Sequence, residues 1–252
     1  MKMFENIDFA TVKGMSFAFD FRRTGGSRIN ANYTLQFADG SGSNQNSGAN
    51  LANSGQPNLR ILTPLDYDQR HTFVLGYDYR FGSGKDYKGP TFKKKNGKIM
   101  QILSDCGFNL SFLLGSGTPY TRNSAAFALG SSKSNILGQI NGSSKPWQFR
   151  TNLRVDKNIP LTWGKDGDSK KQANLNIYLQ VLNLFNRKNV LNVYSYTGNP
   201  DDDGYLTSTQ AAQALALTNS AVAFTNMYQI RINNPTNYSL PRQIRIGLLF
   251  NF

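Results

Sequence analysis

The side chains best able to bind a ligand in this sequence are cationic. Arg150 and Arg154 are four residues apart in a segment of alternating polar and apolar residues, so an extended strand places both on one face. Arg245 lies on the polar face of the last such segment. Guanidinium groups gathered on one surface attract anionic solutes or carboxylates. Two interpretations stay open: a basic patch that meets an anionic partner, or cations paired with nearby acids such as Asp78 and Asp156.

A short acidic segment matches part of a calcium-binding loop. Asn199, Asp201 and Asp203 occupy positions 1, 3 and 5 of that pattern. Gly204 follows at position 6, where the loop turns sharply. Position 12 is Gln210 rather than the bidentate glutamate of the full pattern, which predicts weak calcium binding. The alternative is an Asx-rich turn that leads into a helix and holds no ion.

Groups for catalysis are scarce in this sequence. The single histidine, His71, lies on the apolar face of a predicted strand, and the single cysteine is Cys106. Nucleophilic catalysis on the usual plan needs a base with a positioned partner, and one cysteine excludes an internal disulfide. We therefore expect no enzymatic activity and no cofactor beyond weak calcium, and we expect a packing or interfacial position for His71.

The overall composition leaves several classes of protein open. The mean hydropathy is −0.45, and no window approaches the roughly 18 apolar residues of a membrane helix. A transmembrane β-barrel has a similar mean, because half of each strand faces a polar lumen. The net charge of +13 is compatible with nucleic acid, an anionic membrane surface or an anionic solute. Without a Lys/Arg-rich helix or zinc-ligand spacing, we expect no nucleic-acid partner.

Regular alternation of polar and apolar residues is the main structural signal, and it predicts β-strands. The predicted strands lie near 11–21, 28–38, 69–81, 100–115, 147–157, 172–185 and 241–252. A tilted strand needs about 9–11 residues to cross a bilayer, which is close to these lengths. Aromatic residues lie near several segment ends on the apolar face, as a bilayer interface requires. The last connection, 186–240, is predicted to hold a short helix near 207–218, with Thr207 as its N-cap, and a short strand at 190–197.

The alternation assigns side chains to two faces, and a register slip of one residue would exchange them. The residues expected to contact lipid are Phe17, Phe19, Leu35, Phe73, Leu75, Phe112, Leu153, Ile177, Leu179, Ile246 and Leu248. The residues expected to face a lumen are Asn32, Gln36, Asp78, Arg150, Arg154, Asn176, Gln180 and Arg245.

Four segments, in order, resemble the C-terminal part of the barrel of TonB-dependent receptors, in the broad group that includes the SusC-like transporters. They are LDYDQRHTF (65–73), LLGSGTPYT (113–121), VLNLFNRKN (181–189) and PRQIRIGLLFNF (241–252). The resemblance implies a larger barrel of about 22 strands around a plug. It implies that Leu248, Phe250 and Phe252 form a C-terminal signal for the outer-membrane assembly machinery. It also implies TonB coupling through a plug, outer-membrane lipid, and in some members a surface lipoprotein as partners.

The sequence therefore predicts an all-β fold: one antiparallel transmembrane β-barrel segment of about seven strands, spanning residues 1–252. The expected function is the wall and extracellular-loop segment of an active nutrient transporter in the outer membrane of a diderm (Gram-negative) bacterium. Seven strands and the absence of a signal peptide in MKMFENIDFA lead us to expect part of a longer chain or of a split barrel. The alternatives are a small free-standing porin or adhesin barrel, and a secreted β-sandwich binding module.

Overall fold

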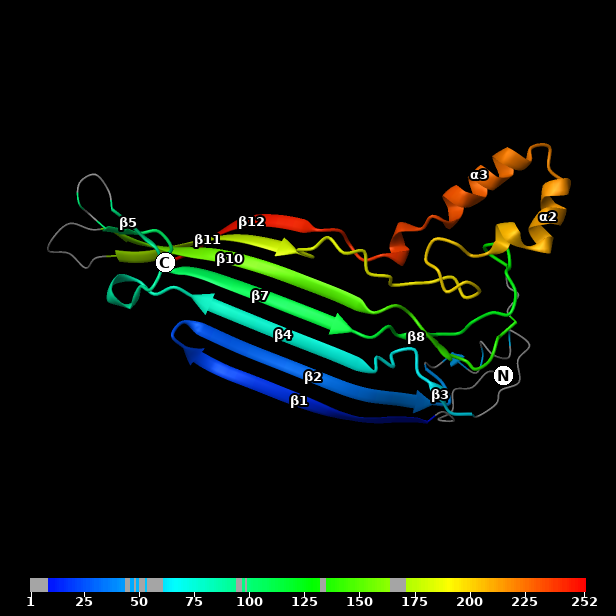
Figure 1. The fold of residues 1–252 in the computed structure, drawn as a ribbon, viewed down its shortest axis with the longest axis horizontal. Coiled ribbons are helices and arrows are strands. Elements are labelled where there is room, and N and C mark those ends of the chain that lie inside the picture. Colours follow the sequence, from blue (N-terminus) through cyan, green and yellow to red (C-terminus); the bar gives the residue numbers. More distant parts are fainter. Residues whose placement is uncertain are drawn as a thin grey trace.

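One wide antiparallel sheet dominates the protein (Figure 1). The computed structural model describes residues 9–43, 46–47, 49, 53, 61–93, 97, 99–131, 135–163 and 171–252. Its long strands, in spatial order, are β1 (Ala10–Thr24), β2 (Ser27–Gly40), β4 (His71–Arg80), β7 (Cys106–Gly115), β10 (Gln148–Trp163), β11 (Lys171–Leu182) and β12 (Gln243–Asn251). The short β3 (Thr63–Pro64) pairs with the end of β2. Each long strand pairs with its predecessor in the chain, so the all-β antiparallel prediction is confirmed.

Turn chemistry explains where several strands end. Gly25 and Gly26 form the turn between β1 and β2 with φ angles of 59° and 95°, which favour glycine. Asp105 closes the turn before β7 with φ 57°, so the segment predicted as one strand at 100–115 is two strands. β11 ends at Leu182, three residues before the predicted end at 185, and Asn183 follows it with φ 54°. Asparagine tolerates this left-handed conformation better than most residues.

β10 continues beyond the predicted end at 157 to Trp163. The extension exists because β10 stays paired with β11 to the last residue, where Trp163 lies opposite Lys171. The sequence prediction stopped early at Lys157, although Ile159 and Leu161 continue the apolar alternation. This hairpin therefore projects past the neighbouring strands (Figure 1).

Short elements occupy the connections. They are the hairpin β5 (Thr91–Lys93) and β6 (Ile99–Gln101), the pair β8 (Pro119–Tyr120) and β9 (Ser143–Ser144), and the 3₁₀ turn η1 (Gly84–Asp86). The last connection holds η2 (Tyr205–Thr207), α2 (Thr209–Ala216), α3 (Ala221–Ile232) and η3 (Pro235–Asn237). No described helix is long and apolar enough to cross a membrane.

The helix prediction in the last connection was wrong in two respects. The N-cap of α2 is Ser208, whose hydroxyl accepts a hydrogen bond from the Ala211 amide at 3.2 Å, and Thr207 instead belongs to η2. The predicted region also contains only the first of two helices, because α3 begins afresh at the Ser220 N-cap. The strand predicted at 190–197 is absent too: in that described range only Val190 forms a bridge, to Tyr238.

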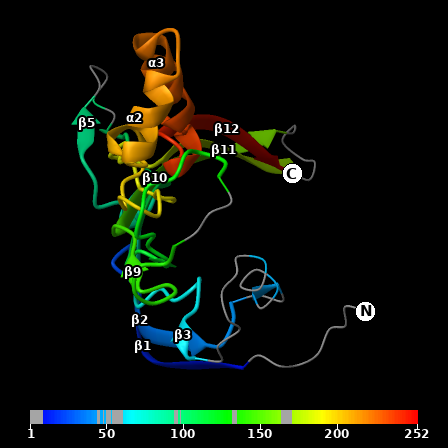
Figure 2. The same ribbon diagram turned by 90° about the vertical axis from the view of Figure 1, so that its right-hand side faces the viewer.

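The sheet is curved, and its two edges turn toward the same side (Figure 2). The three long connections, which follow β2, β7 and β11, all lie at one end of the strands, and the shorter connections lie at the other (Figure 1). In the described part of the chain neither β1 nor β12 has a further strand on its outer side, so the sheet is open there. A β-sandwich needs two packed sheets, whereas the remaining described sheets have two very short strands each.

Candidate functional site

The strand register sorts the sheet into an apolar and a polar face. Residues directly opposite each other in neighbouring strands share a face. One apolar row runs through Phe17, Tyr33, Phe73, Leu114 and Phe149. The same registers place all the residues expected to contact lipid on this apolar face, and all those expected to face a lumen on the other. The division into two faces is therefore confirmed, although the register does not say what each face meets.

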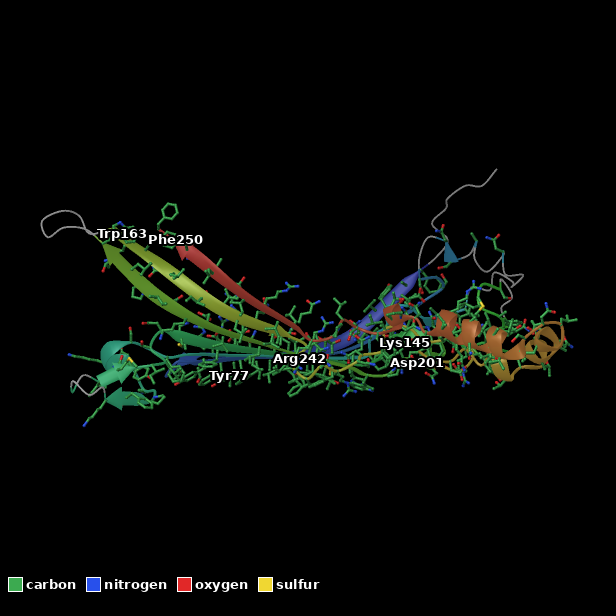
Figure 3. All side chains as sticks on the ribbon, turned by 90° about the horizontal axis from the view of Figure 1, so that it is seen from above. Tyr77, Lys145, Trp163, Asp201, Arg242 and Phe250 are labelled. Atoms are coloured by element: carbon green, nitrogen blue, oxygen red, sulfur yellow. The ribbon has the colours of Figure 1, made fainter. Side chains whose placement is uncertain are left out.

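The apolar face is exposed to a degree that is unusual for a soluble domain. Phe17 is 63% exposed, Ile246 is 78% exposed and Leu248 is 66% exposed. Tyr77, a member of this face, lies on the convex side of the curved sheet (Figure 3). Continuous exposed apolar patches of more than a few hundred Å² mark a contact with a membrane or another protein.

Two aromatic clusters lie on the apolar face. One is a stack of rings that runs from Phe17 and Tyr33, at the centres of β1 and β2, to His71 and Trp147 near the long connections, with centroids 6.5, 6.2 and 5.6 Å apart. At the other end of the strands, Phe81 contacts the rings of Tyr79, Tyr87 and Phe108. His71 and Tyr79 are eight positions apart in β4, a span of about 26 Å at the usual rise. The spacing resembles the aromatic girdles that flank an apolar band of about 25 Å in membrane barrels.

His71 is part of the first cluster and has the packing role expected of it. Its Nδ1 atom lies 2.9 Å from the hydroxyl oxygen of Tyr33, and its ring stacks on Trp147. Cys106, at the start of β7, is a buried free thiol.

An ion pair on the polar face joins two strands that are not neighbours. Asp156 of β10 and Arg80 of β4 both lie opposite Gly107 of β7, and their Oδ2 and Nη2 atoms are 3.0 Å apart. A Cβ at Gly107 would lie only 2.7 Å from each side chain, so glycine makes room for the pair. Asn176 adds a hydrogen bond from its Nδ2 to Asp156 Oδ2 at 3.0 Å and another to Asn158 Oδ1 at 2.6 Å. One of the two interpretations of the sequence paired Asp156 with Arg150, Arg154 or Arg245, whereas Asp156 pairs with Arg80.

The three arginines singled out from the sequence are only partly brought together. Arg154 and Arg245 flank Gln180 in one row of the polar face, two strands apart. The guanidinium of Arg154 lies over the Tyr178 ring at 4.2 Å from its centroid. Arg245 donates a hydrogen bond to Gln243 Oε1 at 3.1 Å. Arg150 lies opposite Leu113, farther toward the long connections.

Tyr178 is a further polar-face residue, and the sequence did not predict its close contact with Gly247. Its ring lies above Gly247 of β12, where a Cβ would come within 2.3 Å of the ring. Gly247 and Gly107 each take the place of a polar side chain in the alternation of their strands. A glycine at such a position indicates that a large neighbouring side chain passes close to the backbone, so the sequence did contain a signal for these contacts. Each glycine lies opposite a large side chain of the neighbouring strand, Tyr178 and Asp156 respectively.

The four segments that carry the family resemblance make contact in two pairs where the strands give way to the long connections, 65–73 with 113–121 and 181–189 with 241–252. Gln69 Nε2 donates to the Ser116 carbonyl at 2.9 Å. Asn183 Nδ2 donates to the Leu240 carbonyl at 3.1 Å, and Asn186 Oδ1 accepts from the Arg242 amide at 2.9 Å. Side chains of these segments thus satisfy backbone groups at the point where ladder pairing stops.

The last connection is an ordered unit with its own small core. Tyr205, Ala211, Tyr228 and Ile232 are buried against one another. The Tyr228 hydroxyl donates to Asp203 Oδ2 at 2.5 Å and accepts from the Leu129 amide at 3.0 Å, which ties the 116–147 connection to this unit. Burial and the hydrogen bond to Asp203 raise the pKa of Tyr228 well above its usual range.

The three candidate calcium ligands already accept hydrogen bonds from the protein. Asn199 Oδ1 accepts from the Asp201 amide at 3.0 Å, and Asp201 Oδ2 accepts from the Tyr238 hydroxyl at 2.5 Å. Asp203 Oδ1 accepts from the Tyr205 amide at 3.0 Å, while its Oδ2 holds Tyr228. The described residues include no group of three or more His, Cys, Asp or Glu side chains placed to hold a metal. These contacts favour the Asx-rich turn, and calcium binding stays a prediction.

The C-terminal residues expected to form an assembly signal lie on an exposed strand end. Leu248 and Phe250 alternate on the apolar face of β12, and the Phe250 and Phe252 rings have centroids 6.0 Å apart. Phe250 and Trp163 lie at one end of the molecule, and Lys145 and Asp201 lie toward the other (Figure 3).

No protein-family model, curated protein or solved structure matches this chain. The residues and their geometry therefore carry the functional interpretation.

Proposed function

We propose that this chain forms part of the wall and the extracellular loops of an outer-membrane β-barrel, in a transporter of the TonB-dependent type. The observation that carries the proposal is the continuous apolar face over seven paired strands, exposed on the convex side of the sheet. A barrel wall needs an apolar outer surface and a polar inner surface, joined by a strict two-residue period. The aromatic clusters at both ends of the apolar band support the same assignment.

In this proposal the polar face lines the lumen. Its ion pair and stacked side chains give a stiff inner surface, and Arg154 and Arg245 present positive charge near Gln180. Such a surface suits the carboxylates of a plug or an anionic solute in passage. The remaining strands, the plug and the TonB contact are to be supplied by other parts of the barrel.

The long connections become the extracellular side. Their mutual hydrogen bonds and the small core around Tyr228 favour a preformed surface for receiving a ligand over three independent loops. The family resemblance supports nutrient uptake with an outer-membrane lipid partner and, through the exposed C-terminal strand, recognition by the assembly machinery. A surface lipoprotein as partner stays a further part of this proposal.

A small free-standing porin or adhesin barrel is the second candidate. The same two faces favour it, because any membrane barrel needs them. The transporter differs in needing more strands and a plug, so the number of strands in the complete barrel discriminates between the two.

Site-specific fluorescence quenching tests the membrane assignment. In a Cys106→Ser background, single cysteines at Ile177 and Gln180 carry a bimane label on opposite faces of β11. With the protein in bilayers that contain nitroxide-labelled lipid, we expect strong quenching at position 177 and little at position 180. Equal quenching at both positions, or quenching only at 180, would overturn the proposal.

A further inference from the structure

A pocket opens at the start of β4, beside the aromatic cluster that includes His71. Its volume is about 350 Å³, and its walls come from residues 64–71, 116–119 and 139–147. That volume lies at the lower end of the range for small-molecule sites, about 300–1,000 Å³. Two connections that are distant in sequence, the one before β4 and the one between β7 and β10, thus build one concave site. Neither the wall nor the lumen needs it.

The pocket lining contains more positive than negative side chains. Arg70, Lys145 and Asp68 are the ionised side chains of its lining. The Asp68 side chain is 2% exposed, and its two oxygens accept hydrogen bonds from the Ala38 amide at 3.0 Å and from Arg70 Nε at 3.3 Å. Arg70 is 53% exposed and keeps its two terminal nitrogens as donors. The accessible part of the pocket therefore presents two cations, while its one acid is buried and occupied.

An aromatic wall continues from the pocket onto the apolar face. Trp147 is 49% exposed, lines the pocket and stacks on His71, whose ring in turn contacts Tyr33 of the apolar face. Arg70 also lies over the Phe37 ring, at 5.3 Å from its centroid. Cationic and hydrogen-bonding groups therefore meet the edge of an apolar surface at this point.

We propose that this pocket binds the phosphate monoester headgroup of a membrane lipid. The inference rests on the proposed function, which places the apolar face in a bilayer and so brings lipid headgroups to the level of Trp147 and His71. The lining carries two cations and one acid, so a phosphate monoester, with a charge of about −1.5 to −2 at pH 7, meets a pocket of net positive charge. The arginine donates to two phosphate oxygens and the lysine acts as a point charge, while the acyl chains lie along the apolar face.

Tryptophan fluorescence gives a local readout of binding. The chain has two tryptophans, so a Trp163→Phe background leaves Trp147 in the pocket as the single reporter. Phosphatidic acid, titrated into the protein in neutral detergent, is expected to change this fluorescence saturably. Lys145→Gln should weaken binding about tenfold or more, as for the loss of one hydrogen bond to a charged group. Lys188 lies over the Tyr238 ring and outside the pocket lining, so it provides the control. Lys188→Gln should bind phosphatidic acid with the affinity of the parent.

Two further titrations identify the source of the phosphate. Phosphatidylglycerol, a phosphodiester of lower charge, should bind about tenfold more weakly than phosphatidic acid, since one unit of charge is missing. Equal affinity for the two lipids would overturn the monoester assignment. Inorganic phosphate that competes at the same concentration as phosphatidic acid would show a site for a soluble anion and overturn the lipid assignment. A flat phosphatidic acid titration, or one that Lys145→Gln leaves unchanged, would overturn the site itself.

These results are separable from the test of the proposed function. The bimane experiment reports which face of β11 meets lipid and does not involve the pocket. Quenching at position 177 with a flat titration would remove the pocket and leave the wall assignment. Quenching at position 180 would remove the wall assignment whatever the titration shows.

Discussion

Arg80 and Asp156 form an ion pair across an intervening strand, and the residue between them is Gly107. The Asp156 side chain is only 11% exposed and the Arg80 side chain 32%, so the pair is partly withdrawn from solvent. A buried pair is worth little over an apolar replacement, but breaking it leaves an uncompensated charge. The pair therefore fixes the relative register of β4, β7 and β10 more than it adds stability.

Gly107→Val should displace this ion pair. The added Cβ would start 2.7 Å from both charged side chains, so they must move apart or the strand must shift. Overpacking of this kind costs about 1–3 kcal/mol, and we expect a loss of that size in denaturant unfolding in lipid or detergent. Ala18→Val, on the exposed polar face of β1, is the matched control and should change stability by less than about 0.5 kcal/mol. An equal loss of stability in the two variants would show that the space at Gly107 is not needed for the Arg80–Asp156 ion pair.

A charge introduced on the apolar face should lower the stability of the protein in a bilayer more than a charge introduced on the polar face. Ile177→Arg places a guanidinium in the middle of this face on β11, where a membrane barrel loses about 2–4 kcal/mol. Asn174→Arg, on the polar face of the same strand, should cost about 1 kcal/mol or less. Folding yield into lipid vesicles, measured over a urea series, compares the two. A similar loss for both variants, or a larger loss for Asn174→Arg, would contradict the membrane assignment.

The two-residue period is a local property, and for that reason the sequence predicted both faces of the sheet correctly. Every residue assigned to a face lies on it, since the side chains of a strand alternate whatever its neighbours do. The partner of Asp156 was not predictable in the same way. Arg80 and Asp156 lie close together because of two strand registers, that of β4 with β7 and that of β7 with β10. Both registers depend on the position of the turn at Asp105.

The errors in the last connection have a different cause. Ser208 and Thr207 are both good N-cap residues, and sequence preference alone does not choose between them. The choice follows from η2, which uses Thr207 because Tyr205 is drawn into the core with Tyr228. The pocket beside Trp147 was not predictable from the sequence either, because its walls come from two connections whose relative placement depends on the sheet.

Tyr228→Phe should loosen the last connection. The substitution removes the hydroxyl that holds Asp203 and accepts from the Leu129 amide, and Asp203 is only 6% exposed. Leaving such groups without a partner costs about 1–3 kcal/mol, more for charged groups. We expect limited proteolysis within 186–240 to accelerate about fivefold to 150-fold, which is that energy range expressed as an opening equilibrium. Tyr196→Phe, an exposed tyrosine of the same connection, should leave the cleavage rate unchanged.

The same hydroxyl sets an alkaline limit for this unit. The pKa of Tyr228 lies above its unfolded value of 10.0, first because of burial and then because of the hydrogen bond to Asp203. The neutral form is therefore favoured in the folded state, and its contribution to stability is complete below pH 10 and lost as pH rises through the higher folded pKa. The pKa values of Tyr194 and Tyr238 in the same connection are also raised, so tyrosinate absorbance of the parent should show three tyrosines that ionise late. Tyr228→Phe should show one fewer, and the step it loses should be the one that coincides with loop opening above pH 10. Ionisation of every tyrosine near pH 10 in the parent would contradict this account.

Calcium should leave the cleavage of the last connection unchanged in the parent protein. The oxygens of Asn199, Asp201 and Asp203 accept hydrogen bonds from amides and tyrosine hydroxyls, so the turn is already held by protein contacts and has little to gain from an ion. Asp203 is unsuitable for testing a metal site by mutation, because its loss would release Tyr228 with or without calcium. Asp201→Asn is the better variant, since it removes one charge from an exposed residue and keeps an oxygen for Tyr238. We expect equal proteolysis rates with calcium and with a chelator in both proteins. A slower rate with calcium in the parent, abolished by Asp201→Asn, would instead establish the calcium loop.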